Sequence, residues 1–179
     1  ELYAGIRGCG VFRSSKPLDT VATSLGEYMT DGNTVLLLHM NETAGSTLRD
    51  ASSFGRAGVA TGATAVSGRF GNCRMFSGVS DSVTVFGQLL GSGNGTYTVE
   101  LWMYLTSYPA SEAAKVWSQA PLLGGWPRVE GRIDGGGTFA FVMHGDGGGY
   151  GEIWSNQSIP FGRWTHVAVT RDSTVPGTV

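Results

Sequence analysis

The strongest constraint on the fold is a strict alternation in residues 97–105, which read YTVELWMYL. Successive side chains of a β-strand point to opposite faces, so residues two apart share a face. One face of this segment is apolar and consists of Tyr97, Val99, Leu101, Met103 and Leu105. The other face carries Thr98, Glu100, Trp102 and Tyr104. We predict a strand with one buried face and a partly aromatic second face that is half covered or presents a ligand surface.

Further segments show strand patterns. Thr138–His144 and Trp164–Arg171 alternate in the same way, and Tyr150–Ser155 is placed to pair with the former as a hairpin. Val35–Met40 is a short apolar run between turn residues, which is typical of a buried strand. Ala113–Trp117 is expected to form a single helical turn. These patterns predict at least five strands and almost no helix.

Composition favours an all-β fold. Glycine makes up 29 of the 179 residues, about 16% against a usual ~7%, and charged residues make up only 15%. Short strands joined by glycine-rich turns explain this, so we predict an antiparallel β-sandwich. The net charge of −2, with scattered basic residues, argues against nucleic-acid binding. The longest apolar run, Val35–Leu38, is too short for membrane insertion.

Four segments resemble, in the correct order, the motifs of one known family. They are VLLLHMNETAGSTLRDASSFGRAG, SGRFGNCRMFSGVSDSVTV, YTVELWMYL and GRWTHVAVTRD. From Val35 to Val179 the chain resembles the laminin-G-like, concanavalin-A-like jelly-roll domain, of the kind found in tandem in phage tail or capsid-associated proteins. The resemblance implies an antiparallel jelly-roll β-sandwich whose last strands lie beyond Val179. It also implies that His166 is structural and forms a hydrogen bond between strands.

The resemblance divides the chain into two parts. Residues 31–179 correspond to a laminin-G-like domain without its late strands. Residues 1–30 resemble the tail strand and linker that end a preceding domain. In the alternative, Glu1–Phe12 supplies a missing strand, either within its own chain or to a neighbouring chain. The two interpretations differ in whether the N-terminal residues pair with the sheets of this domain.

Exposed aromatic rings are the residues expected at a carbohydrate-binding site. A flat ring packs against the apolar face of a sugar, while nearby carboxylates and amides bind its hydroxyl groups. The candidate aromatic residues are Trp126, Tyr150 and Trp154, and the candidate hydrogen-bonding residues are Asp146 and Asn156. Packing in the core or at the rim is the alternative role for any one of the three rings.

No catalytic residues are assigned. Concanavalin-A-like glycosidases need two facing carboxylates, which are about 5–5.5 Å apart in retaining enzymes. On a strand, such a pair would lie two or four residues apart on one face. Glu152 has no carboxylate at positions 150, 154 or 156, and Glu100 has Thr98 and Trp102 as its neighbours on that face. We expect a non-enzymatic protein, with a glycoside hydrolase of unusual site as the last alternative.

Metal binding and disulfide formation are two features that the sequence leaves open. A structural Ca²⁺ is considered because the resembled fold often holds one. Asp50, Asp81 and Asp134 lie in loop-like surroundings, but they match no known calcium spacing and no ligand is assigned. Cys9 and Cys73 are compatible with one disulfide. Two free buried thiols are the favoured interpretation.

The expected function follows from the resemblance. It implies a non-enzymatic virion structural, decoration or adhesion module of a phage. A lectin-like carbohydrate-binding module of a secreted or bacterial surface protein is the alternative. The expected partners are other virion or surface proteins, surface glycans and further copies of the same chain. The expected location is the virion surface or the extracellular space.

Overall fold

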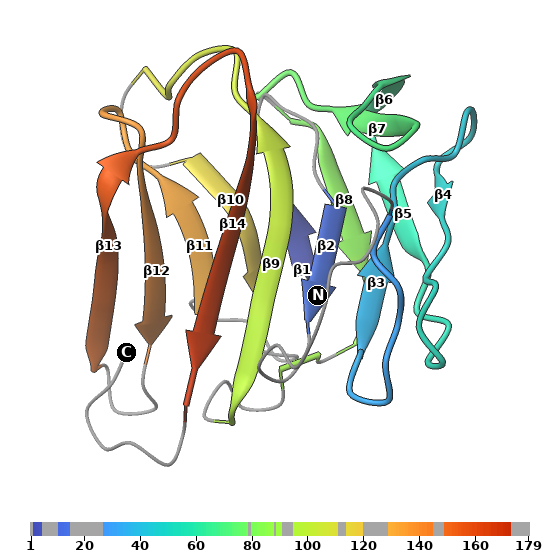
Figure 1. Cartoon of the computed structure of the whole chain (residues 1–179), viewed down its shortest axis with the longest axis horizontal. Helices are drawn as coiled ribbons and strands as arrows, with labels where there is room; N and C mark the ends of the chain where they lie inside the picture. Colours follow the sequence, from blue (N-terminus) through green and yellow to red (C-terminus); the bar gives the residue numbers. More distant parts are fainter. Residues whose placement is uncertain are drawn as a thin grey trace.

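A computed structural model shows a chain built of β-strands in two main sheets (Figure 1). The structure describes residues 2–4, 11–14, 27–78, 80–87, 89–90, 95–110, 114–119, 129–144 and 149–172. Every regular element within these ranges is a strand. In the same ranges, no helix is long and apolar enough to cross a membrane. The prediction of an antiparallel all-β sandwich is confirmed.

The larger sheet contains eight antiparallel strands. In spatial order they are β13 (Tyr150–Ser158), β12 (Thr138–His144), β11 (Val129–Ile133), β10 (Ala114–Gln119), β1 (Leu2–Ala4), β8 (Ser82–Val85), β5 (Gly58–Thr61) and β4 (Thr47–Leu48). Strand β13 therefore lies at one edge of this sheet and β4 at the other.

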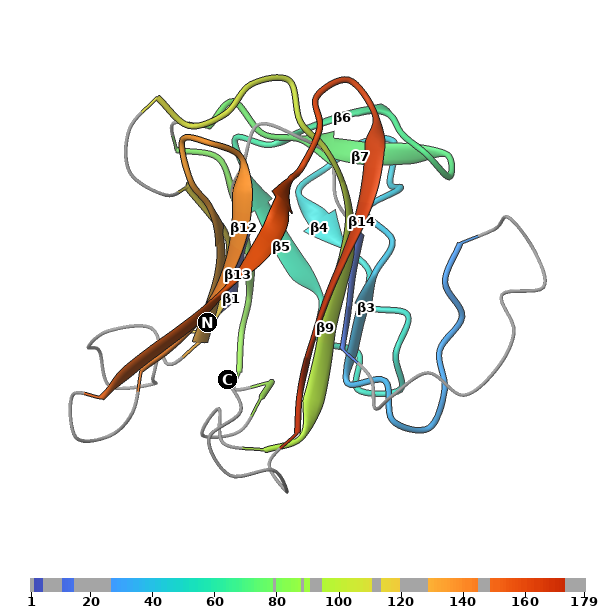
Figure 2. The same cartoon turned by 60° about the vertical axis from the view of Figure 1, so that its left-hand side comes forward.

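The smaller sheet contains four antiparallel strands and forms the second layer of the sandwich (Figure 2). In spatial order they are β14 (Trp164–Arg171), β9 (Tyr97–Tyr104), β2 (Val11–Ser14) and β3 (Leu36–Leu38). A separate hairpin consists of β6 (Thr64–Ser67) and β7 (Asn72–Met75). This hairpin lies near the end of the smaller sheet where β9 ends and β14 begins.

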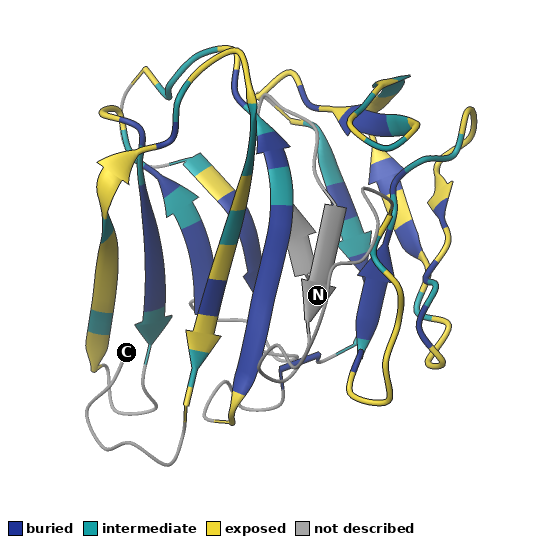
Figure 3. Cartoon of the chain, viewed as in Figure 1, coloured by how far each residue is buried: buried dark blue, intermediate teal, exposed yellow. Residues whose placement is uncertain are grey.

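The hydrophobic core fills the space between the two sheets. Alternate residues of β9 and β12 point into it, as the sequence pattern predicts. The largest buried apolar side chains of the core include Trp117, Phe141, Leu36, Leu38 and Ile133. Figure 3 shows that β9, β11 and β12 are largely buried, whereas β13 at the edge of the larger sheet is largely exposed. The sandwich therefore offers β13 to solvent as its most accessible strand surface.

The side chains on the outward face of β9 become more exposed along the strand. Thr98 and Glu100 are buried, whereas Trp102 and Tyr104 are only partly covered. The Nε2 atom of His166 in β14 lies 3.1 Å from Glu100 Oε2, across the pairing of β14 with β9. This contact confirms the hydrogen bond between strands that the resemblance implies for His166.

Both N-terminal strands occupy interior positions. Strand β1 pairs with β8 on one edge and with β10 on the other, and β2 pairs with β9 and β3. These pairings agree with the alternative in which the N-terminal residues supply strands within their own chain. The domain boundary at residue 30 stays a prediction.

The helical turn expected at Ala113–Trp117 is wrong, because Ala114–Gln119 form strand β10. This strand pairs with β1 on one edge and β11 on the other. Val116 and Trp117 are β-branched and aromatic residues that suit a pleated surface, and both are buried in the core. Tertiary pairing and burial therefore override the local helical preference of the alanines and lysine.

The favoured interpretation of free thiols is also wrong. Cys73 in β7 is 2% exposed and is disulfide-bonded. No cysteine among the residues that the structure describes is free, and Cys9, the only other cysteine in the sequence, lies outside those residues. The β6–β7 hairpin therefore carries a covalent cross-link in addition to its packing contacts.

Gly131 of β11 allows two core rings to approach the backbone, and its replacement tests this packing. A β-carbon there would lie 2.3 Å from Trp117 Nε1 and 2.9 Å from Phe139 Cζ. We expect Gly131→Ala to lower the free energy of unfolding by about 2 kcal/mol, because an overpacked core must shift. Chemical denaturation measures the change. Gly95→Ala is the matched control, since its β-carbon would meet nothing within 4 Å, and equal losses would contradict the packing explanation.

Candidate functional site

Strands β11, β12 and β13 present polar and aromatic side chains on the outer face of the larger sheet. The period of two places Tyr150, Glu152 and Trp154 on the same face of β13. Ala140 of β12 pairs with Trp154, and Arg132 of β11 pairs with Ala140. Arg132 and Trp154 therefore lie in one row, two strands apart. We call the side chains of Arg132, Tyr150, Glu152 and Trp154 the Arg132 face.

Arg132 is the centre of the contacts on this face. Its Nη2 atom donates hydrogen bonds to the Tyr150 hydroxyl at 2.8 Å and to Glu152 Oε2 at 2.7 Å. Its guanidinium carbon lies 5.6 Å from the ring centroid of Trp154, within the range of a cation–π contact. Its Nη1 atom lies 3.6 Å from Glu130 Oε1. One guanidinium thus joins both aromatic residues and two carboxylates.

Hydrogen bonds fix the charges on the Arg132 face. The Tyr150 hydroxyl donates to Glu152, and this bond is the main reason that the pKa of Glu152 lies below its ordinary value. A hydrogen bond from the Trp154 side chain and the charge of Arg132 lower that pKa further. The bond to Glu152 also raises the pKa of Tyr150. At neutral pH, Glu152 is therefore an anion and Tyr150 keeps its proton.

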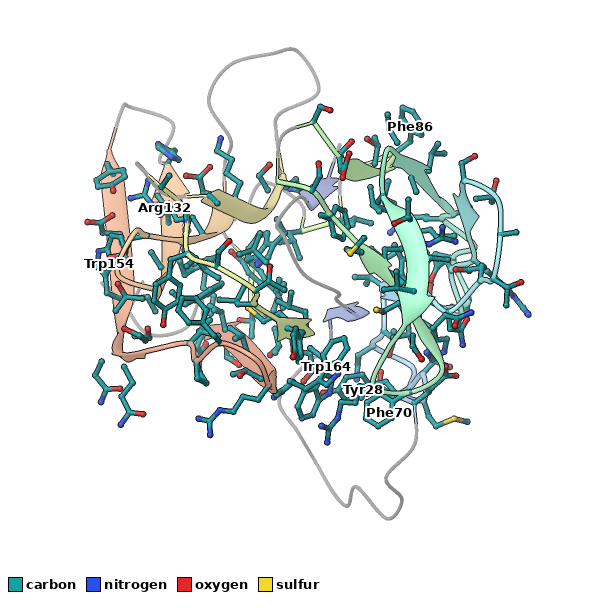
Figure 4. All side chains as sticks on the ribbon, turned by 90° about the horizontal axis from the view of Figure 1, so that it is seen from above. Tyr28, Phe70, Phe86, Arg132, Trp154 and Trp164 are labelled. Atoms are coloured by element: carbon teal, nitrogen blue, oxygen red, sulfur yellow. The ribbon has the colours of Figure 1, made fainter. Side chains whose placement is uncertain are left out.

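The two rings stay accessible although their polar atoms are bonded. Tyr150 is 55% exposed and Trp154 is 43% exposed. They are four residues apart on one strand, which separates their Cα atoms by about 13 Å. Ala140, between Arg132 and Trp154 in the row, is fully buried, so the longer side chains cover the sheet there. Figure 4 shows Arg132 and Trp154 close together on the outer side of the larger sheet.

The five predicted carbohydrate-binding residues have different outcomes. The structure brings Tyr150 and Trp154 together on one face. Asn156 is exposed further along β13, where the register with β12 shifts, and no described contact joins it to that pair. Trp126 and Asp146 lie outside the residues that the structure describes. Carbohydrate binding by any of the five stays a prediction.

The sequence interpretation does not include Arg132 and Glu130, although a signal for their strand was present. Val129 and Ile133 point into the core while the two charged residues alternate with them, which is the pattern of a half-exposed strand. Lys115 of β10 is a further charged neighbour, with its Nζ atom 3.0 Å from Glu130 Oε2. Only the pairing of β10 with β11 brings these charges together.

The aspartates considered for calcium do not form a metal site. The carboxylate oxygens of Asp50 accept hydrogen bonds from three backbone N–H groups at 2.8–2.9 Å. Asp134 accepts two such bonds, and Asp81 accepts one from Ser77 at 2.5 Å. Within the described ranges, no three His, Cys, Asp or Glu side chains form a group that could hold a metal ion. A structural Ca²⁺ held by other residues stays a prediction.

One family model matches the chain. It is a laminin G model described as the concanavalin A-like lectin/glucanases superfamily, and it matches residues 76–179, more than half of the chain. This range contains β8 to β14 and thus every residue of the Arg132 face. No curated protein and no solved structure matches the sequence or the fold of this chain.

Proposed function

The chain belongs to the laminin G family of the concanavalin A-like lectin/glucanases superfamily. We propose that it binds carbohydrate on the Arg132 face. One observation carries the proposal. Two exposed rings, Tyr150 and Trp154, lie on one strand beside the carboxylate of Glu152 and the guanidinium of Arg132. This combination offers flat apolar area together with a hydrogen-bond acceptor and donors.

The chemistry of the Arg132 face suits a sugar chain. The rings of Tyr150 and Trp154 supply apolar surface for stacking, while Glu152 accepts and Arg132 donates hydrogen bonds to hydroxyl groups. Their mutual contacts hold these side chains in place before a ligand arrives, which reduces the entropy lost on binding. The Cα atoms that carry the two rings are about 13 Å apart, which is longer than one sugar ring. The expected ligand is therefore an oligosaccharide rather than a monosaccharide.

The contacts of the carboxylates support a non-catalytic role. A glycoside hydrolase needs one carboxylic acid that is protonated before the reaction, with a raised pKa. The pKa of Glu152 is instead lowered, chiefly by the hydrogen bond from Tyr150. Glu130 is buried and contacts two cations, Lys115 and Arg132. Neither carboxylate is placed to act as a general acid.

We also propose a virion or extracellular surface as the location. The disulfide of Cys73 supports this, because disulfides persist mainly in oxidising environments. The order of the sequence motifs, which resembles tandem domains of phage and bacterial surface proteins, supports it as well. Adhesion through surface glycans would join the proposed location and the proposed ligand. Other virion or surface proteins are the expected neighbours of such an adhesion module.

A glycan array, followed by calorimetry with the strongest oligosaccharide, tests the proposed function. Trp154→Ala is expected to weaken binding by about 10-fold or more, because it removes a stacked ring from the ligand surface. Arg132→Ala should also weaken binding, since it removes the donor that orients Tyr150 and Glu152. Both variants lie on an exposed face, and thermal melting shows whether each is folded.

Phe86→Ala is the matched control for Trp154→Ala. Phe86 is a 65% exposed aromatic residue at the other end of the molecule from Trp154 (Figure 4). Its removal should leave glycan binding unchanged. Equal weakening by both variants, or the failure of the parent chain to bind any glycan, would remove the carbohydrate-binding proposal.

A further inference from the structure

A pocket separate from the Arg132 face lies at one end of the smaller sheet. It has a volume of about 720 Å³ and lies between the β6–β7 hairpin and the end of the smaller sheet. The residues that line it include Thr64, Met75, Ser77, Asp81, Tyr104 and Trp164. None of its described lining residues belongs to the Arg132 face. Its chemistry therefore has to be explained separately from the proposed glycan site.

Two aromatic rings form one corner of this pocket. Trp164, the first residue of β14, pairs with Tyr104, the last residue of β9. Their ring centroids are 5.7 Å apart and their planes meet at 62°. Both residues are partly exposed, and Figure 4 shows Trp164 on the outer side of the smaller sheet. The two rings contact each other edge to face and together form an aromatic corner of the pocket, where both stay partly exposed.

Asp81 supplies the charge of the pocket. It is the only charged residue among the described residues that line it. Its Oδ2 atom accepts a hydrogen bond from the Ser77 N–H at 2.5 Å, which holds the carboxylate at the pocket wall. Its Oδ1 atom lies against Gly62, where an added β-carbon would be 2.1 Å away. The pocket therefore combines one anion with two aromatic faces.

The neighbouring ring on β9 already carries a cation from the chain itself. The guanidinium carbon of Arg69 lies 3.9 Å from the ring centroid of Trp102 and 5.1 Å from that of Phe70. Trp102 shares the outward face of β9 with Tyr104, two residues away. In the described part of the chain, no cationic side chain stacks in this way on Tyr104 or Trp164. A cation from outside that stacks there displaces no described cationic side chain.

We propose that this pocket binds an organic ammonium cation of the type of the choline quaternary ammonium group. The faces of Tyr104 and Trp164 attract such a cation through their ring quadrupoles, and Asp81 supplies the opposite charge. Aromatic faces around a quaternary ammonium group are an established recognition mode. This pocket shares no described residue with the Arg132 face. The outcome of the choline test is therefore independent of the glycan proposal.

Titration calorimetry of the full chain with choline chloride tests the proposal. The uncharged analogue 3,3-dimethyl-1-butanol has nearly the same shape and serves as the matched ligand. We expect choline to bind about 10-fold more tightly than this analogue. Trp164→Leu and Asp81→Asn should each weaken choline binding by about 3- to 30-fold. Asp81→Asn keeps an oxygen that accepts the hydrogen bond from Ser77. This variant therefore removes the charge while the loop keeps its hydrogen bond.

Trp154→Ala, on the larger sheet, is the control and should leave choline binding unchanged. Absence of choline binding, or equal affinity for choline and the uncharged analogue, would overturn the proposal. Tighter binding of methyl α-glucoside than of choline, lost in Trp164→Leu, would overturn it too and assign the pocket to sugars. If choline binds, co-sedimentation with phosphatidylcholine vesicles supports a lipid headgroup as the ligand, and no co-sedimentation supports a free solute.

Discussion

Replacing Asp50 with alanine is expected to lower the free energy of unfolding by about 3–5 kcal/mol. Asp50 is 6% exposed, and its carboxylate accepts hydrogen bonds from the backbone N–H groups of Leu37, Ser52 and Arg56. It also accepts one from the Ser52 hydroxyl. Alanine would leave these donors without a partner, and each buried unsatisfied donor costs about 1–3 kcal/mol. Urea unfolding of the variant and the parent chain measures the loss.

Asp50→Asn is the matched control for this prediction. It keeps the size of the side chain and one acceptor oxygen, but it places an NH₂ group against a donor. The loss of stability should therefore lie between those of the parent chain and the alanine variant. An alanine variant whose stability is within about 1 kcal/mol of the parent would contradict the role of Asp50 as the shared acceptor.

The lowered pKa of Asp50 predicts that the stability of the fold depends on pH. Burial alone would raise the pKa of Asp50, but the hydrogen bonds from Leu37, Ser52 and Arg56 outweigh it and lower the pKa below 3.8. A carboxyl group whose pKa is lowered by folding stabilises the fold above its unfolded pKa, and this contribution is lost as the pH falls through its folded pKa. As the pH falls below about 4, the parent should lose stability that Asp50→Asn does not lose.

Breaking the disulfide of Cys73 is expected to lower the free energy of unfolding by about 2–4 kcal/mol, or the melting temperature by about 10 °C. A cross-link restricts the unfolded chain, and the effect grows with the length of the closed loop. Cys9 is the only other cysteine and is distant in sequence, so the expected loop is long. Thermal melting with and without a reducing agent measures the change.

Cysteine variants distinguish this effect from the loss of packing around the sulfur. Cys73→Ser and Cys9→Ser should each cause the same loss, and the double variant should lose no more than either one. Additive losses would contradict a bond between the two. The reducing agent should have no effect on the melting temperature of any of the three variants.

Local sequence patterns predicted five of the observed strands, namely β3, β9, β12, β13 and β14. Burial on one face imposes alternation within a single segment, which makes the longer of these strands recognisable. Strands β12 and β14 have the predicted bounds, and β9 ends one residue earlier than predicted. Strand β13 continues past the predicted end, Ser155, to Ser158. Strand β10 was interpreted as a helical turn because its first residues favour a helix locally, and pairing on both of its edges decides otherwise.

The Arg132 face could be predicted only in part. Tyr150 and Trp154 lie on one strand, so their shared face follows from the period of two. Arg132 reaches them across β12, and its contact with Tyr150 depends on the registers of β11 with β12 and of β12 with β13. The three strands are consecutive in the sequence, and their registers are set by the turns that join them. The residue types on the strands do not specify these registers, and a shift by one residue would turn Arg132 into the core.

The interior positions of β1 and β2 have a mechanical consequence. A strand at the edge of a sheet can peel from one neighbour at a time, whereas a strand with two neighbours must break two ladders together. Tension at the N-terminal end of the chain would load β1, between β8 and β10, and then β2, between β9 and β3. Extraction of this segment would open both layers of the sandwich. Pulling at that end must therefore break strand pairings in both sheets.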